Sequence, residues 1–158
     1  MLNREELNAL FGYCLSLTRE RQSAEDLLHN GVEKLLRSKA AARNPVSYTR
    51  TIIRNLFIDQ CRRNKIVSFE TLDDDAPLIL NERDLEEVWL DRDHIDKLLD
   101  QLGVAERETL FLWAVAGYTS AEIAAEIDVP RGTVLARLHR IKQKLNVINF
   151  EQNLSGGW

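Results

Sequence analysis

Residues 119–145 read TSAEIAAEIDVPRGTVLARLHRIKQKL. Thr119 and Glu122 have the spacing of a capping box, which predicts that a short helix begins here. The Asp-Val-Pro sequence at 128–130 predicts a tight turn after it. Apolar residues then recur at helical spacing and predict a longer helix that buries Val134, Leu138, Ile141 and Leu145. A short helix, a tight turn and a longer helix together make a helix-turn-helix.

The longer of these two helices is basic, since it has no acidic residue between 131 and 145. Its basic residues, with histidine included, are Arg131, Arg137, His139, Arg140, Lys142 and Lys144. The residues predicted on or near its outward face are Gly132, Leu135, Ala136 and His139. A recognition helix presents its first half to the edges of DNA bases in this way. The alternative is a basic, solvated helix with no ligand.

The first 65 residues are predicted to form three helices. Leu7, Leu10, Cys14 and Leu17 keep helical spacing in the first. Ser23 followed by Asp26 has the pattern of an N-cap with an acidic first turn, and predicts the start of the second. The residues predicted on one apolar face of this helix are Leu28, Val32, Leu35 and Leu36.

Asn44 and Pro45 predict the start of the third helix, because a capping side chain followed by proline is a common helix beginning. The residues predicted to form its buried stripe are Tyr48, Ile52, Ile53, Leu56 and Phe57. We expect this three-helix unit to end near Lys65.

The middle of the chain is acidic. Residues 66–93 carry two Lys or Arg against ten Asp or Glu, whereas 1–65 carry twelve against seven and 94–158 carry seven against eight. Residues 66–83 also lose helical periodicity, which predicts a linker that reaches about 60 Å when extended at ~3.3 Å per residue. That is the length of roughly 17–18 base pairs of DNA. From Leu85 onward helical spacing returns. The predicted fold is therefore all-α, with two small helical domains at 1–65 and 94–158 joined by the acidic segment 66–93.

Composition excludes several classes of function. The net charge is −4 over 158 residues, and no stretch approaches the ~20 apolar residues of a membrane span. The only cysteines, Cys14 and Cys61, lie at apolar helical positions away from any metal-ligand spacing, and we expect them to be reduced core residues. No nucleophile, base and acid set and no glycine-rich phosphate loop is present, so we expect no catalytic residues, no metal and no cofactor.

Four segments, in this order and spacing, resemble an extracytoplasmic-function (ECF) sigma factor of bacterial RNA polymerase. They are AEDLL at 24–28, YTRTIIRNLFIDQCRR at 48–63, EIAAE at 122–126 and GTVLARLHR at 132–140. The resemblance covers nearly the whole chain. It implies an alternative sigma factor that directs promoter recognition, promoter melting and transcription initiation, and that has no enzymatic activity.

In this family the first domain melts and reads the minus-ten promoter element, and the second reads the minus-thirty-five element. The resemblance places the minus-ten contacts on Asn44, Tyr48, Arg54, Asn55, Asp59, Arg62 and Arg63. It places the loop that captures a flipped-out base at 40–47. The minus-thirty-five contacts fall on Arg131, Gly132, Thr133, Leu135, Ala136, His139 and Arg140. An opened strand needs polar and aromatic groups for its bases and cations for its phosphates, and the first set supplies both. The alternatives are that Tyr48 belongs to the core and that the arginines only form a helix end exposed to water.

The resemblance also implies partners. Asp26, His29, Asn30 and Glu33 fall on the helix that docks on the clamp helices of the largest polymerase subunit, although the family usually has Gln at 29 and an acid at 30. The flap of the second-largest subunit, promoter DNA and an anti-sigma factor are the other expected partners, in the cytoplasm. The acidic run at 73–75 matches a segment that threads the polymerase channels, and a plain soluble spacer is an equal alternative.

Two other functions remain open from sequence. One is a sigma-like mimic that binds an anti-sigma factor without starting transcription; such proteins carry a receiver domain, for which this chain has no room. The other is a simple helix-turn-helix regulator, which leaves the polar and basic residues from Asn55 to Arg63 unexplained.

Overall fold

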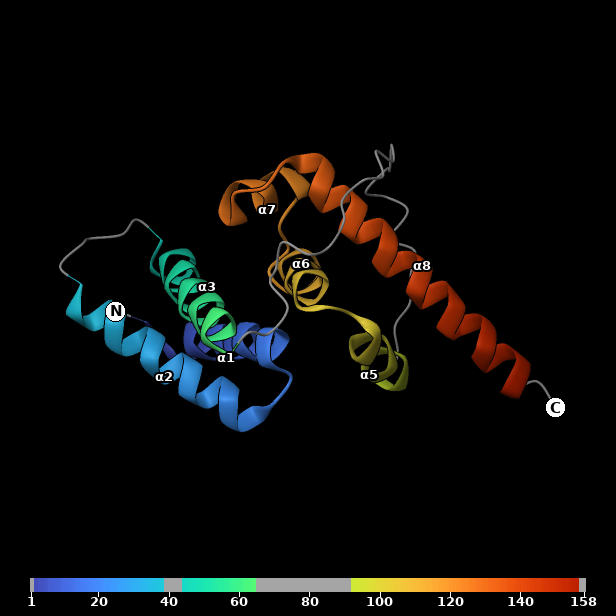
Figure 1. The fold of residues 1–158 in the computed structure, drawn as a ribbon, viewed down its shortest axis with the longest axis horizontal. Coiled ribbons are helices and arrows are strands. Elements are labelled where there is room, and N and C mark those ends of the chain that lie inside the picture. The colour runs from blue at the N-terminus through green and yellow to red at the C-terminus, as the bar shows by residue number, and fades with distance from the viewer. Residues whose placement is uncertain (1, 39–43, 65–91, 157–158) are drawn as a thin grey trace. The chain divides into compact units, whose positions relative to one another are not determined.

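The computed structural model describes residues 2–38, 44–64 and 92–156, and in these ranges every regular element is an α-helix (Figure 1). The chain divides into two compact units, residues 1–73 and 74–158. The all-α prediction is confirmed. The linker at 66–83 and the apolar positions around Leu85 lie outside the described residues, so the predicted domain boundaries remain predictions.

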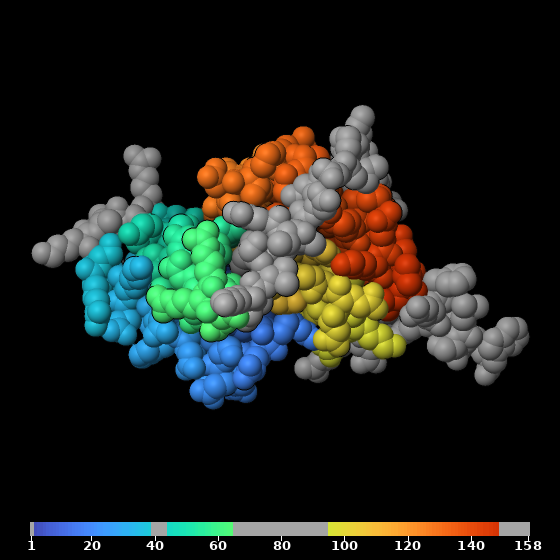
Figure 2. All heavy atoms as spheres, in the orientation of Figure 1, coloured from blue at the N-terminus to red at the C-terminus, as the bar shows by residue number. Residues whose placement is uncertain are grey.

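The described residues of the first unit form three helices, α1 (Arg4–Thr18), α2 (Arg21–Arg37) and α3 (Pro45–Arg63). Each packs against the other two, and α2 and α3 lie side by side at the surface (Figure 2). The buried apolar side chains of the unit are Leu10, Tyr13, Cys14, Leu17, Ala24, Leu27, Ile53 and Cys61. Removing these groups from water is the main force that holds the three helices together.

Local capping sets the ends of α1. The side chain of Asn3 accepts a hydrogen bond from the backbone N–H of Glu6 at 2.8 Å, which satisfies one of the free donors of the first turn. Arg19 ends the helix in the left-handed conformation, with φ of 58°, and its N–H bonds to the carbonyl of Leu15.

The prediction that Ser23 caps α2 is wrong. The helix begins at Arg21 with Glu20 as its N-cap residue, and Ser23 lies in the first turn. The hydroxyl of Ser23 donates to the carboxylate of Glu20 at 3.1 Å. The carbonyl of Glu20 already accepts the first helical bond, from Ala24, and the helix therefore starts earlier than its best capping residue.

The apolar face of α2 also differs from the prediction. Its buried positions are Ala24, Leu27 and Gly31, while Leu28 is only half-buried. Leu36, predicted on the buried face, is 65% exposed. The buried stripe is therefore rotated by about one residue, or roughly 100° of helix, from the predicted one.

The third helix begins as predicted. Asn44 accepts a hydrogen bond from the N–H of Ser47 at 3.2 Å, and Pro45 occupies the first helical position. The helix ends at Arg63, close to the predicted end. Of the predicted stripe only Ile53 is buried, and the other buried positions of the helix are Thr49, Arg50 and Cys61.

The second unit contains α5 (Arg92–Gln101), α6 (Val104–Ala114), α7 (Ser120–Ile127) and α8 (Arg131–Gly156). The long α8 packs against each of the other three. Its predicted buried stripe is confirmed, and the apolar core of the unit is Leu98, Leu102, Ala105, Leu112, Ile123, Ala124, Ile127, Val134, Leu138, Ile141, Leu145 and Ile148.

The helix predicted at 106–116 is α6, which begins and ends two residues earlier. It is followed by Gly117, whose φ of +73° is the left-handed conformation that glycine adopts without strain. The N–H of Tyr118 bonds back to the carbonyl of Leu112 at 2.9 Å, which closes the end of the helix.

A partly buried ion pair connects α6 to α8. The side chain of Glu106 is 2% exposed, and the ammonium group of Lys144 lies 3.1 and 3.0 Å from its two carboxylate oxygens. The same ammonium donates to the carbonyl of Gln101, the last residue of α5, at 3.0 Å. A single side chain of α8 therefore bonds to both α5 and α6.

In the part of the chain that the structure describes, no helix is long and apolar enough to cross a membrane. No group of three or more His, Cys, Asp or Glu in that part could hold a metal ion. Both cysteines are buried free thiols. Burial raises the pKa of the Cys14 thiol to about 12.

Candidate nucleic-acid interface

The helix-turn-helix consists of α7 and α8, and its first helix has the predicted capping box. The hydroxyl of Thr119 accepts from the N–H of Glu122 at 3.2 Å, and the Glu122 carboxylate accepts from the N–H of Thr119 at 3.1 Å. Asp128, with φ of 56°, then turns the chain in the left-handed conformation. Aspartate tolerates this conformation better than most residues, so the turn is encoded locally.

A hydrogen bond fixes the start of α8 against α7. The Nε of Arg131, the first residue of α8, donates to the hydroxyl of Ser120 at 3.0 Å. Ser120 is the first residue of α7 and is fully buried. The first turns of the two helices are thus held together by side chains as well as by the turn.

Most of the residues predicted to read the minus-thirty-five element are accessible to some degree. Arg131 and Gly132 are exposed, and half-buried positions are held by Thr133, Leu135, His139 and Arg140. Ala136 is only 3% exposed, so its predicted outward position is wrong. A side chain that ends at Cβ is easily screened by longer ones three and four residues further along the helix, here His139 and Arg140.

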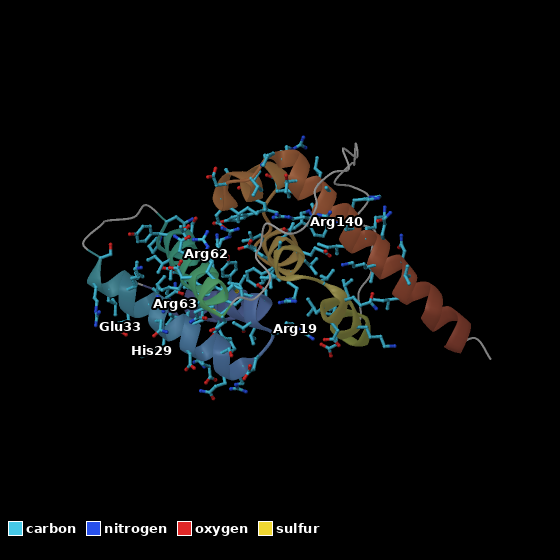
Figure 3. All side chains as sticks on the ribbon, viewed as in Figure 1. Arg19, His29, Glu33, Arg62, Arg63 and Arg140 are labelled. Carbon is cyan, nitrogen blue, oxygen red and sulfur yellow. The ribbon has the colours of Figure 1, made fainter. Side chains whose placement is uncertain are left out.

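Arg137 does not contribute to the basic surface as predicted, because it is 4% exposed. Counted by helix rotation, it lies about 60° from Val134 on the side of the buried stripe. The exposed or half-exposed positive charge of α8 therefore comes from the remaining basic positions. Arg140 is the one labelled in Figure 3.

The residues predicted to contact the minus-ten element lie mostly on one side of α3. Asn55, Asp59 and Arg62 follow at intervals of four and three residues, so they share a face, and all three are exposed. Arg63 is exposed beside them, and both arginines lie in the last turn, where cations favour the negative end of the helix dipole (Figure 3). Arg54 is half-buried and lies about 100° away from Asn55. Asn44 is exposed, and residues 39–43 of the predicted base-capture loop lie outside the described residues.

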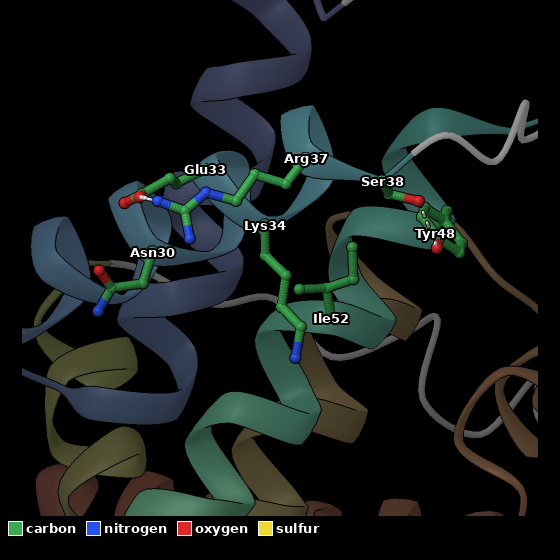
Figure 4. A pocket seen from close by; sticks show the side chains of 7 residues that line it. All are labelled: Asn30, Glu33, Lys34, Arg37, Ser38, Tyr48 and Ile52. Carbon is green, nitrogen blue, oxygen red and sulfur yellow. Dashed lines mark hydrogen bonds and ion pairs between the residues drawn. The ribbon is translucent and has the colours of Figure 1, made fainter.

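Tyr48 is neither a core residue nor a fully exposed one. It is half-buried, and its hydroxyl lies 3.2 Å from the hydroxyl of Ser38 at the end of α2. Both line a pocket of about 610 Å³ between α2 and α3, which Figure 4 shows from close by. The lining residues are Asn30, Glu33, Lys34, Arg37, Ser38, Tyr48 and Ile52. The pocket therefore brings two predicted polymerase-binding residues next to a predicted DNA-binding one.

The predicted polymerase-binding residues are together on the outer side of α2. Asp26, His29, Asn30 and Glu33 are all exposed. His29 and Glu33 are labelled in Figure 3, one helical turn apart. Glu33 also accepts a hydrogen bond from Arg37 at 2.6 Å, in an exposed pair. Such a pair contributes little to stability, so these charges remain available to a partner.

Leu36 is a surface residue that sequence analysis missed. It lies seven residues after His29, which places it on the same outer side of α2. Its side chain is 65% exposed, so it is accessible to a partner that docks on this side of α2. Its spacing from His29 indicated that it lies on the polar side of the helix. As a leucine next to Leu35, however, it fits the apolar face equally well.

Both units match sigma-factor family models. The Sigma-70 region 2 model matches residues 2–66, which contain the whole of α1, α2 and α3. The Sigma-70 region 4 model matches residues 92–145, which contain α5, α6, α7 and the first part of α8. These are the two regions that the sequence motifs had indicated.

Relatives that match most of the chain carry the same identification. The chain is 30% identical over 149 residues to the ECF RNA polymerase sigma factor SigL of Mycobacterium tuberculosis, with 85% of this chain and 79% of SigL covered. The chain belongs to the ECF sigma factors. It is also 27% identical to the ECF RNA polymerase sigma factor EcfG of Rhodopseudomonas palustris, over 90% of this chain and 80% of EcfG. It is accordingly an alternative sigma factor that directs transcription initiation, as the motifs predicted.

The fold is that of a solved sigma factor. RpoE of Bartonella quintana, in complex with the anti-sigma factor NepR, matches with a TM-score of 0.64 and 24% identity, over 89% of each chain. The match supports the fold of this sigma factor.

Proposed function

We propose that this sigma factor binds core RNA polymerase and opens promoter DNA, with residues 1–65 reading the minus-ten element and residues 94–158 the minus-thirty-five element. The observation that carries the proposal is the exposed face of α3, where Asn55, Asp59 and Arg62 align. A regulator that used only its helix-turn-helix would have no need of this second polar and basic face. An opened strand offers bases for hydrogen bonding and phosphates for cations, and this face has groups for both.

The minus-thirty-five duplex is assigned to the first half of α8. Arg131 and Arg140 would hold phosphates, while Leu135 and His139 would meet the base edges together with Gly132 and Thr133. Ala136 has no part in this assignment, since it is only 3% exposed.

Docking on the polymerase is assigned to the outer side of α2, with the clamp helices of the largest subunit as its partner. The exposed group of Asp26, His29, Asn30 and Glu33 offers hydrogen bonds and negative charge, and Leu36 adds apolar area beside it. The second unit would meet the flap of the second-largest subunit. We assign this sigma factor no catalytic residue and place it in the cytoplasm, where polymerase and promoters are.

An anti-sigma factor is a further proposed partner. The solved sigma factor with the same fold was crystallised with one, NepR. The surfaces that this chain would present to polymerase are also those that an inhibitor has to cover, so one partner would exclude the other.

The decisive experiment mixes the purified chain, core polymerase and promoter DNA that carries a base analogue fluorescent only when unstacked. We expect no signal from the chain alone, because a small domain cannot meet the cost of unpairing DNA without a clamp that holds the strand. Core enzyme with the chain should give a signal, and core enzyme alone should not. A chain that binds an anti-sigma factor but never opens promoters with core enzyme would be a mimic instead.

The docking assignment has its own test, the substitution Asp26→Lys. Because Asp26 is exposed, thermal melting should stay unchanged, while co-elution with core polymerase should weaken strongly through like-charge repulsion in the interface. Glu5→Lys makes the same change of charge at an exposed position of α1 and serves as the control. Undiminished co-elution of Asp26→Lys would remove this residue from the docking surface.

A further inference from the structure

The hydroxyl groups of Ser38 and Tyr48 form a link between α2 and α3. Ser38 follows the last residue of α2, and its N–H is held by the carbonyls of Lys34 and Leu35 at 3.1 and 3.0 Å. Tyr48 lies in the first turn of α3, and its N–H bonds to the carbonyl of Asn44 at 3.0 Å. Both backbones are thus fixed by their own helices, and the two side chains meet across 3.2 Å (Figure 4).

Packing alone does not hold the ring of Tyr48. The residue is half-buried, and one side of it faces the pocket of about 610 Å³ that it lines with Ser38 and Ile52. A side chain beside open space can change rotamer with little loss of contact, since close packing is what restricts a buried ring. The hydrogen bond to Ser38 is therefore the directional restraint on where the ring lies.

We propose that Ser38 is a positioning residue for Tyr48, holding its ring in the orientation that meets the opened minus-ten strand. This rests on the proposed function, in which α3 reads that element. Stacking of a base on an aromatic ring depends on how the ring is presented, and a ring already held loses less freedom on binding. Ser38 acts through Tyr48 and need not touch DNA itself.

The test compares Ser38→Ala, Tyr48→Phe and the double variant in promoter opening with saturating core polymerase. Tyr48→Phe keeps the ring and removes only the hydroxyl. Each single variant should slow opening by roughly three- to tenfold, the range of one modest hydrogen bond, and the double variant should be no slower than Tyr48→Phe. Ser38→Thr keeps a hydroxyl and should recover most of the rate. Ser16→Ala removes a half-buried hydroxyl of α1 and should open promoters as the wild type does.

Two further measurements separate positioning from a structural role. Across a set of minus-ten variants, Ser38→Ala should lose part of the wild-type preference, while thermal melting and affinity for core polymerase stay unchanged. Normal rate and preference in Ser38→Ala, or a fold loss in the double variant equal to the product of the two single losses, would overturn the proposal. Equal losses on all promoters with a lowered melting temperature would overturn it as well. If the wild-type chain opens no promoter with core enzyme, the proposed function itself fails.

Discussion

Gly31 of α2 lies against Ile53 of α3 so closely that a Cβ added to it would be 2.5 Å from Cγ1 of Ile53. Ile53 is fully buried, so it has little room to move away. The absence of a side chain at 31 thus sets how closely α2 and α3 approach, and with it the geometry of the pocket and of both candidate surfaces in the first unit.

Gly31→Ala should destabilise the first unit, although alanine favours helices. Overpacking costs about 1–3 kcal/mol, while the gain in helix propensity is about 1 kcal/mol, so we expect a net loss of roughly 1–2 kcal/mol in urea unfolding. Gly132→Ala is the matched control, because nothing lies within 4 Å of a Cβ there. Its stability should be equal to or above that of the wild type. A Gly31→Ala variant as stable as Gly132→Ala would show that Ile53 yields easily.

Lys144→Met should lower the free energy of unfolding, because it leaves the buried carboxylate of Glu106 without its ion pair. Removing one partner of a buried pair costs about 3–5 kcal/mol, and since Lys144 is 34% exposed we expect about 1–3 kcal/mol. Adding Glu106→Gln to this variant should recover part of the loss, because no charge then remains buried. A double-mutant cycle, measured by urea unfolding, gives the coupling free energy between Lys144 and Glu106. Additive effects of the two substitutions on the free energy of unfolding would contradict the ion pair.

Stability should fall at alkaline pH through Cys14. Burial raises the pKa of this thiol from 9.0 to about 12, so the unfolded chain loses the proton first as pH increases. The contribution is therefore fully present below pH 9 and is lost progressively between 9 and about 12. Cys14→Ala, though less stable overall, should show a shallower decline of unfolding free energy over this range. Iodoacetamide should label Cys14 only when the chain is unfolded, and rapid labelling of the native chain would contradict its burial.

Leu36→Ala should weaken binding to core polymerase without lowering the melting temperature. The side chain is 65% exposed, so the folded chain loses little by its removal. In an interface, loss of an apolar contact worth about 1–2 kcal/mol reduces affinity roughly tenfold. Leu36→Met conserves volume and apolarity and should bind nearly as the wild type. Unchanged affinity of Leu36→Ala would confine docking to the polar residues of α2.

In α8, Arg140 and His139 should have separable effects on minus-thirty-five DNA. Arg140→Ala should weaken binding to different sequences alike and reduce the slope of affinity against salt by about one, as expected for a lost phosphate contact. His139→Ala should instead change the order in which promoters are preferred. Arg131 is less suitable for this test, since it also bonds to Ser120. A competition assay with unchanged ranking and affinity in both variants would show that α8 does not read DNA.

Signals carried by neighbouring residues predicted two helix starts correctly. Asn44 with Pro45, and Thr119 with Glu122, place a capping group and its backbone partner within one turn, so no other part of the chain decides them. Ser23 had the same type of signal and is not a cap. The carboxylate of Glu20, three residues before Ser23, accepts a hydrogen bond from the Ser23 hydroxyl. The local sequence pattern allows this arrangement as well as a cap.

Features that depend on packing between helices could not be predicted from neighbouring residues. Leu27, Leu28, Leu35 and Leu36 allow α2 two helical phases, and contact with α1 and α3 selects the phase that buries Leu27 and exposes Leu36. The bond between Ser38 and Tyr48 joins residues ten positions apart, and only the packing of α2 on α3 brings them together. The candidate surfaces could thus be predicted as sets of residues, but not the contacts within them.

The open space around Gly132 has a consequence for how such a protein diversifies. A Cβ introduced there has no atom of the described residues within 4 Å, so the surrounding structure does not oppose a side chain at this position. Gly31 is the reverse case, where the side chain of Ile53 on the neighbouring helix opposes any larger residue. In the proposed function this position faces the minus-thirty-five element, so in a gene duplicate of this sigma factor a substitution at 132 would change promoter contacts without disturbing the fold, and the first turn of α8 would acquire a new target sequence while the remainder of the molecule is retained.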